Sequence, residues 1–420
     1  MRIELKALAA VFAIFNCGCT AAIAESWQIG TPITTYYGGH PISEKIAEQM
    51  SDGGFNLICC TEQELDTAGK YGLRAHLHAP ELRDRVAIMN DPAQTVALDA
   101  LIERVKRHPA MYAYYITDEP NASLFPALGK LVAHLRERDP AHVAYINLFP
   151  TYANNGQLGT KGETIAAYRE YLRLFIEQVK PDILSYDHYH FTASGADGNQ
   201  YFLNLAMIRR AALDAGIPFM NIVQGGTWDS GMRAPNGDEM RWLNYTSLAY
   251  GAQALSYYVY YRHPAWAIFG EKAGMMMRPD GSTTAQYAAA RELNPQFIAI
   301  ASELQPLCSL GAYHVGLVPW GAAALPANAP FSLDFSGNGL PRLPAEGMLL
   351  GYFGKAGTSA GPTHVLVVNL NYKSAVTTTV VGPTRLYLFD TAAHEWTSAP
   401  GSRAAVTLPP GGGKLIRVQR

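Results

Sequence analysis

The stretch YYITDEPNAS, Tyr114 to Ser123, determines how the rest of the chain is interpreted. Its first four residues are aromatic or β-branched, which is typical of a buried β-strand. Asp118 and Glu119 follow where this strand ends, and Pro120 cannot donate a hydrogen bond to a neighbouring strand. Two adjacent carboxylates at a strand end repel each other and lose hydration, so we expect a function that uses them.

Strand-like and helix-like segments alternate around this stretch, from residue 26 to residue 305. An open doubly wound sheet would more often carry a glycine-rich phosphate turn after its first strand, and TYYGGHP (35–41) is not one. Eight strand-like segments, each followed by a helix-like one, match an α/β fold of the (β/α)8 TIM barrel type. The expected strands lie within 26–37, 55–60, 73–79, 111–117, 142–149, 182–189, 218–226 and 254–261.

The pattern changes near residue 310 to short alternating runs such as HVLVVNLNY (364–372) and AVTTTVV (375–381). Gly, Pro and Asn separate these runs, which is typical of an all-β fold. We therefore predict a catalytic barrel over residues 25–312 and a small C-terminal β-sandwich over residues 313–420, which caps the barrel or binds glycan.

The first 24 residues have the features of a secretory signal peptide. Arg2 and Lys6 precede the apolar run ALAAVFAIF (7–15), and Ala22 and Ala24 occupy the small positions before a cleavage point. The run is too short to span a bilayer. We expect cleavage after Ala24 and a secreted or periplasmic protein; a lipoprotein anchor at Cys19 is the alternative.

The composition restricts the class of partner. Hydrophobic residues make up 48% of the chain, charged residues 16%, and the formal net charge is -2, which argues against nucleic acid or an anionic membrane as the main partner. The 24 tyrosines favour a ligand with apolar faces and hydroxyl groups. Cys59, Cys60 and Cys308 remain after signal cleavage, and we interpret them as small core residues.

In a barrel of this type, function gathers at the carboxyl ends of the strands. Acids, amides and aromatic rings occur at these ends, and together they suggest a carbohydrate site, with the rings against the sugar faces and the polar groups on its hydroxyls. No organic cofactor is implied and no metal is required. The predicted catalytic pair is Asp118 and Glu119, and the predicted substrate contacts are Tyr36, His78, Asn147, Asp187, Tyr189, Gln224, Trp228 and Tyr260.

Several of these residues have more than one interpretation. Asp187 either orients a sugar hydroxyl, acts as a nucleophile, or is a buried acid paired with an arginine. His188 and His190 raise the possibility of a metal site, but no third ligand is evident, so contact with sugar or a place at the rim is favoured.

The motif resembles two groups of barrel hydrolases. The retaining clan that includes β-galactosidases carries Asn-Glu at the end of strand 4 and a nucleophilic Glu at the end of strand 7; here these places hold Asp118-Glu119 and Gln224, which cannot be a nucleophile. YYITDEP is more similar to the β-N-acetylhexosaminidases of glycoside hydrolase families 20 and 123. The resemblance implies that Asp118 polarises the substrate's 2-acetamido group and Glu119 is the general acid and base, with Tyr189 or Tyr260 on the acetamido carbonyl.

The resulting prediction is an exo-acting, retaining, substrate-assisted glycoside hydrolase that releases terminal β-N-acetylhexosamine, with galacto favoured over gluco by the family 123 likeness. One alternative is a β-galactosidase-like glycosidase with a displaced nucleophile such as Asp187. The other is a sugar-binding barrel without catalysis, which Gln224 favours and the intact Asp118-Glu119 pair opposes.

Overall fold

The computed structural model describes residues 30–37, 42–84, 86–195, 197–228, 231–261, 275–336, 343–357 and 361–418. The predicted signal segment lies outside these residues. Within them, no helix combines the length and apolar character needed to cross a bilayer.

The predicted barrel is confirmed. Eight parallel strands form one sheet in the part of the chain that the structure describes, in the order β1-β8-β7-β6-β5-β4-β3-β2. Both faces of the sheet are buried, as expected of parallel strands surrounded by helices, and in β7 every residue is buried. The strands are β1 (Ile33–Tyr36), β2 (Leu57–Cys60), β3 (Arg74–Leu77), β4 (Met111–Asp118), β5 (Val143–Leu148), β6 (Leu184–Asp187), β7 (Phe219–Gln224) and β8 (Ala254–Tyr258).

The two end strands, β1 and β2, close the barrel through a few hydrogen bonds. The backbone N–H of Asn56 donates to the carbonyl of Thr34 at 3.0 Å. The Asn56 side chain accepts from the Thr34 N–H at 3.1 Å, and the Thr35 hydroxyl donates to the carbonyl of Leu57 at 2.7 Å. Side-chain bonds therefore supplement the backbone contact at this seam.

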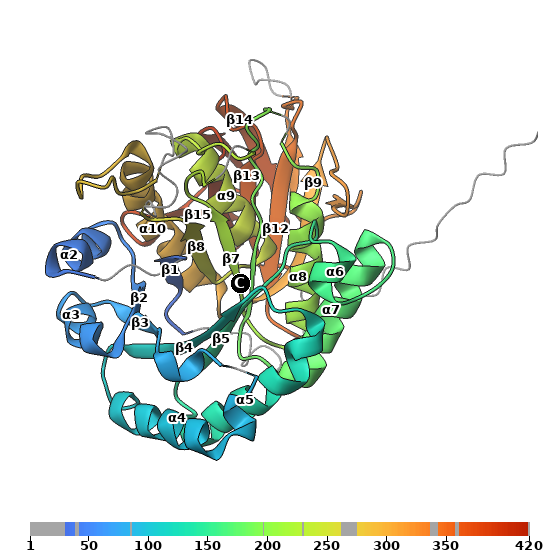
Figure 1. Cartoon of the computed structure of the whole chain (residues 1–420). Coiled ribbons are helices and arrows are strands. Elements are labelled where there is room, and N and C mark those ends of the chain that lie inside the picture. The colour runs from blue at the N-terminus through green and yellow to red at the C-terminus, as the bar shows by residue number, and fades with distance from the viewer. Residues whose placement is uncertain are drawn as a thin grey trace, which may run out of the picture.

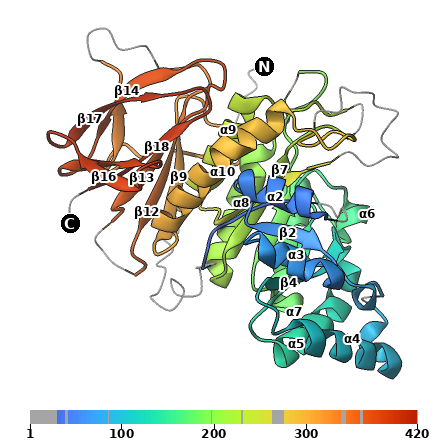
Figure 2. The same cartoon turned by 90° about the vertical axis from the view of Figure 1, so that its left-hand side faces the viewer.

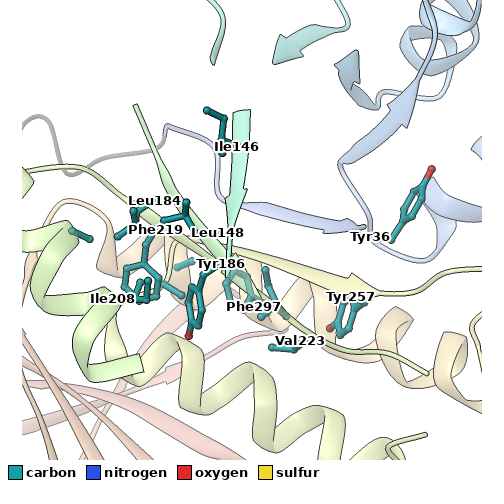
Figure 3. Packing of buried hydrophobic residues seen from close by; sticks show 14 of the residues in the cluster. Tyr36, Ile146, Leu148, Leu184, Tyr186, Ile208, Phe219, Val223, Tyr257 and Phe297 are labelled. Carbon is teal, nitrogen blue, oxygen red and sulfur yellow. The ribbon is translucent and has the colours of Figure 1, made fainter. Parts of the chain in front are cut away.

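Helices surround the sheet (Figure 1) and pack on its outward-facing residues. Leu184 and Val223 from the strands lie in one hydrophobic cluster with Ile208 and Phe297 from the helices (Figure 3). The helices are α2 (Glu44–Asp52), α3 (Leu65–Lys70), α4 (Pro92–Val105), α5 (Phe125–Arg138), α6 (Asn155–Leu158), α7 (Thr164–Val179), α8 (Tyr201–Ala215), α9 (Gly237–Tyr250) and α10 (Ala285–Leu304).

A C-terminal β-domain follows the barrel and lies beside α9 and α10 (Figure 2). Its described residues form two sheets, in the orders β10-β9-β12-β13-β18-β15-β16 and β11-β14-β17. Strand β9 begins before the boundary at 312–313 that the sequence predicts, because it pairs with β12. The strands are β9 (Cys308–Val315), β10 (Ala323–Ala324), β11 (Ser332–Asp334), β12 (Met348–Gly354), β13 (His364–Asn369), β14 (Val376–Val381), β15 (Leu386–Asp390), β16 (Glu395–Ser398), β17 (Arg403–Leu408) and β18 (Gly413–Val418).

The two domains approach each other closely. Gly351 of β12 lies so near helix α9 that a Cβ at this position would be 2.3 Å from the carbonyl oxygen of Ala249. Tyr372, from the loop after β13, donates its hydroxyl to Asp197 in the loop after β6, at 2.5 Å. The β-domain thus contacts a loop at the carboxyl end of the barrel. Cys59, Cys60 and Cys308 are buried, as predicted.

Candidate active site

The site is built around the end of β4. Glu119, directly after the strand, has φ of 43°, in the left-handed region that non-glycine residues rarely adopt and that costs about 1–2 kcal/mol. Two hydrogen bonds hold this turn: the Glu119 N–H donates to the carbonyl of Asn147 at 2.9 Å, and the hydroxyl of Tyr171 donates to the carbonyl of Pro120 at 2.8 Å. Strained backbone of this kind is concentrated at functional sites.

Asn147 joins the carboxylates of two strands. It lies beside Asp118 in the register of β4 and β5. Its side-chain Nδ2 donates to Asp118 Oδ1 at 3.0 Å and to Asp187 Oδ1 at 2.8 Å. One amide group therefore orients two acids, which come from β4 and β6.

The amide of Asn147 is itself held from inside the barrel. Ser185 donates its hydroxyl to Asn147 Oδ1 at 3.1 Å, and the hydroxyls of Tyr145 and Ser185 are 2.8 Å apart. Because Oδ1 accepts this bond, Nδ2 must face the carboxylates. Tyr145 and Ser185 are fully or almost fully buried, so bulk water does not compete for these hydrogen bonds.

Asp187 and Glu119 share a hydrogen bond between their carboxyl groups. Burial and the charge of Asp118 raise the pKa of Glu119 to about 7. Burial, followed by the charges of Glu119 and Asp118, raises the pKa of Asp187 well above its usual range. The pair therefore retains a proton near neutral pH, and the cluster of Asp118, Glu119 and Asp187 contains both a proton donor and an anion. One interpretation of the sequence paired Asp187 with an arginine. In the structure its partners are Asn147 and Glu119 instead.

Aromatic rings lie near the cluster, among them those of Tyr37, Tyr189 and Tyr258. Tyr189 and Trp228 have ring centroids 4.4 Å apart, and Trp228 and Tyr258 are 4.7 Å apart. Tyr258 is 6.3 Å from Tyr37, whose hydroxyl is hydrogen-bonded to that of Tyr115. The rings form a continuous aromatic wall, defined here as Tyr37, Tyr115, Tyr189, Trp228 and Tyr258.

The structure does not bring two of the predicted contacts, Tyr36 and Tyr260, to this wall. Tyr36 packs on the helix side of the sheet and donates its hydroxyl to the carbonyl of Cys59 (Figure 3). Tyr260 is fully buried and bonds Gln49 at 2.6 Å. Strand alternation places the neighbouring Tyr37 inside the barrel, and Tyr258 occupies the end of β8. The runs of adjacent tyrosines indicate that aromatic rings lie at these strand ends. The sequence does not show which of these rings point into the barrel.

Gln224, another predicted contact, is buried and bonds backbone groups instead of facing the wall. Its Nε2 donates to the carbonyls of Phe191 and Arg233, at 2.9 and 2.6 Å, and its Oε1 accepts from the N–H of Phe191 at 2.9 Å. Both amide hydrogens are therefore engaged, and the side chain is fully buried. Gln224 ties together the segments that follow β6 and β7, next to Tyr189 and Trp228.

The remaining predicted residues lie at or behind the mouth. His78 stacks on Tyr115, with ring centroids 4.0 Å apart, and burial lowers the pKa of His78 to about 4. His188 is buried behind the site and its Nδ1 lies 2.9 Å from Asn204 Oδ1. Within the described residues, no group of His, Cys, Asp or Glu suits a metal ion.

The fold is similar to that of several solved structures. A β-galactosidase from Bacillus circulans sp. alkalophilus matches with a TM-score of 0.52 at 10% identity, over 93% of this chain and 100% of that one. A family 39 glycoside hydrolase from the gut symbiont Bacteroides cellulosilyticus WH2 matches with a TM-score of 0.48 at 12% identity, over 94% of this chain and 82% of that one. These neighbours are glycoside hydrolases, and at such low identity the likeness shows the fold alone. No family model and no curated protein matches the sequence.

The bonding of Gln224 leads to a stability prediction. Gln224→Glu places a carboxyl group against two carbonyl oxygens and removes two donors. We expect the free energy of unfolding at neutral pH to fall by about 3 kcal/mol, measured by chemical denaturation.

Gln296→Glu is the matched control, because Gln296 acts as an acceptor for Tyr245 and glutamate keeps that role. Equal stability of the two variants would contradict the structural role of Gln224.

Proposed function

We propose that the chain is a glycoside hydrolase that releases terminal β-N-acetylhexosamine, with β-N-acetylgalactosaminides favoured. The observation that carries the proposal is the cluster of three carboxyl groups around Asn147, one with a pKa of about 7, beside an aromatic wall. The fold supports it, because active sites of such barrels lie at this face. The likeness of YYITDEP to families 20 and 123 supports the choice of sugar.

The first step assigned to Glu119 is proton donation to the glycosidic oxygen. A carboxyl group with a pKa near 7 is protonated in about half of the molecules in neutral solution and remains strong enough to donate. Loss of that proton leaves a carboxylate that can later take a proton from the attacking water. Its hydrogen bond with Asp187 gives it a partner in both protonation states.

The second step needs a group that meets the positive charge at the anomeric carbon. In the proposed mechanism the substrate's acetamido oxygen attacks this carbon as the bond to the leaving oxygen breaks. Asp118 is exposed and is oriented by Asn147, so its carboxylate can accept a hydrogen bond from the acetamido N–H and stabilise the cyclic cation. Water then attacks the anomeric carbon, gives its proton to Glu119 and restores the acetamido group.

Two features argue against the displaced-nucleophile alternative. Asp187 is only 3% exposed, and burial raises its pKa well above the usual range, which opposes the ionised form that a nucleophile needs. Gln224 has no acid function and is engaged with the backbone. Export through residues 1–24 is part of the proposal and suits a substrate outside the cytoplasm.

The substrate prediction follows from the role of Asp118. Purified protein should release nitrophenol from aryl β-glycosides of N-acetylhexosamines and not from plain galactosides or glucosides. Asp118→Asn should lower kcat/KM about 10²–10⁴-fold on every aryl leaving group. Glu119→Gln should lose most on poor leaving groups.

Asp66→Asn, at a side chain that is fully exposed, is the control and should behave as the parent protein. Near-normal activity of Asp118→Asn, or turnover of plain galactosides, would refute substrate assistance.

The pH profile is a separate prediction. Activity on a poor leaving group requires protonated Glu119, so kcat/KM should fall as the pH rises through about 7. Asp118→Asn removes a negative charge that raises this pKa, so the alkaline limb of its residual activity should move to lower pH. If the alkaline limb of Asp118→Asn stays at the same pH, the limb does not report the titration of Glu119.

A further inference from the structure

Strand β4 extends beyond its neighbour β3 at the carboxyl end of the barrel. The last β3–β4 pair joins Leu77 to Tyr114, and β3 ends there, whereas β4 continues to Asp118. A cavity of about 460 Å³ lies above the end of β3, against Tyr115 and Ile116 of β4. This volume is within the range of about 300–1,000 Å³ that is usual for small-molecule sites.

The cavity borders the aromatic wall. Tyr115 lines it, and the hydroxyl of Tyr115 is hydrogen-bonded to that of Tyr37. His78 also lines it and stacks on Tyr115 with the two ring planes 17° apart. The stacked pair therefore separates the cavity from the rest of the barrel mouth, and a molecule that passes over Tyr115 contacts both.

Its lining mixes apolar and polar groups. Ala79 and Pro80, after β3, supply apolar surface, and Thr61 and Gln63, after β2, supply a hydroxyl and an amide. Such a combination suits a sugar ring, which has apolar faces and hydroxyl groups at its edge.

The charges that line the cavity are balanced. Arg104 donates to Glu62 at 2.7 and 2.9 Å and to Glu81 at 3.3 Å. With Arg83, the lining contains two cations and two anions. A neutral ligand fits this balance better than an anion or a cation, because it leaves the ion pairs intact.

The position of the cavity relative to the acids indicates which part of a substrate it takes. Tyr189, Trp228 and Tyr258 lie toward β6–β8, on one side of β4, whereas the cavity lies toward β2 and β3, on the other side. Asp118 and Glu119, at the end of β4, lie between the two regions. A terminal sugar against the three rings would direct its leaving group toward the cavity.

We propose that this cavity is a second subsite that binds a neutral sugar on the leaving-group side of the bond that is cleaved. The inference rests on the proposed function and names its substrate class: a disaccharide or longer chain, rather than a single sugar on a small aglycone.

The first measurement compares two substrates with the same terminal sugar. One is N,N′-diacetylchitobiose, or N-acetylgalactosaminyl-β-1,4-galactose if the galacto sugar is preferred, and the other is the methyl β-glycoside. We expect kcat/KM for the disaccharide to exceed that for the methyl glycoside at least tenfold. Equal values would overturn the inference.

Ala79→Trp tests the cavity directly, because the new side chain fills it. The disaccharide-to-methyl ratio of kcat/KM should fall at least tenfold. Ala97→Trp, at an exposed position of α4, is the matched control and should leave the ratio unchanged. If Ala79→Trp does not fold, Gln63→Ala replaces it, and the ratio should fall severalfold. An unchanged ratio in the folded variant would overturn the inference.

The failure of the subsite and the failure of the proposed function are distinguishable. If no glycoside is cleaved, the function is wrong, and calorimetric titration with the same disaccharides decides the subsite. Binding that is weakened by Ala79→Trp and not by Ala97→Trp would support it. Equal affinity of the variants, or no binding to the parent protein, would overturn it.

Discussion

The site depends on one side-chain amide, that of Asn147, held between the carboxylates of Asp118 and Asp187. Its Nδ2 hydrogens serve two acids from different strands, and its Oδ1 is occupied by Ser185. The register of β4, β5 and β6 brings these residues side by side. Without the amide, Asp118 and Asp187 would lose the hydrogen-bond donor that they share.

The acid cluster also links function to stability. Glu119 has a higher pKa in the folded protein than its ordinary value of 4.5, so the folded state binds more protons than the unfolded state between about pH 4.5 and 7. Stability from this group is present at low pH and decreases as the pH rises through that window. The same burial and neighbouring charge that raise the pKa of Glu119 thus oppose folding in neutral solution.

Supports outside the cluster maintain the geometry. Gln224 bonds the segments that carry Tyr189 and Trp228, and Arg233 forms two hydrogen bonds with Glu239 while lying over the ring of Phe191. Tyr372 of the β-domain bonds Asp197 in the loop after β6. The β-domain therefore contacts a loop at the carboxyl end of the barrel as well as the side of the barrel.

The order of the elements could be predicted because each strand and helix has its own hydrophobic period and its own stop signals. The strand end at Asp118-Glu119 could also be predicted, because acids and a proline follow an aromatic and β-branched run. The sequence could not predict which tyrosines point into the barrel. Strands buried on both faces show no alternation, and β4 contains an irregularity between Tyr115 and Thr117 that shifts its phase. The role of Gln224 depends on bonds to residues far along the chain, which local sequence does not encode.

The proposed chemistry depends on a proton that the cluster of Asp118, Glu119 and Asp187 retains near neutral pH. Infrared difference spectroscopy of the carboxylic C=O stretch, recorded while the pH is raised from 6 to 8, tests it without a substrate. We expect a protonated carboxyl band from Glu119 that disappears near pH 7 and that Glu119→Gln lacks. Carboxyl groups that are all ionised below pH 6 would contradict it.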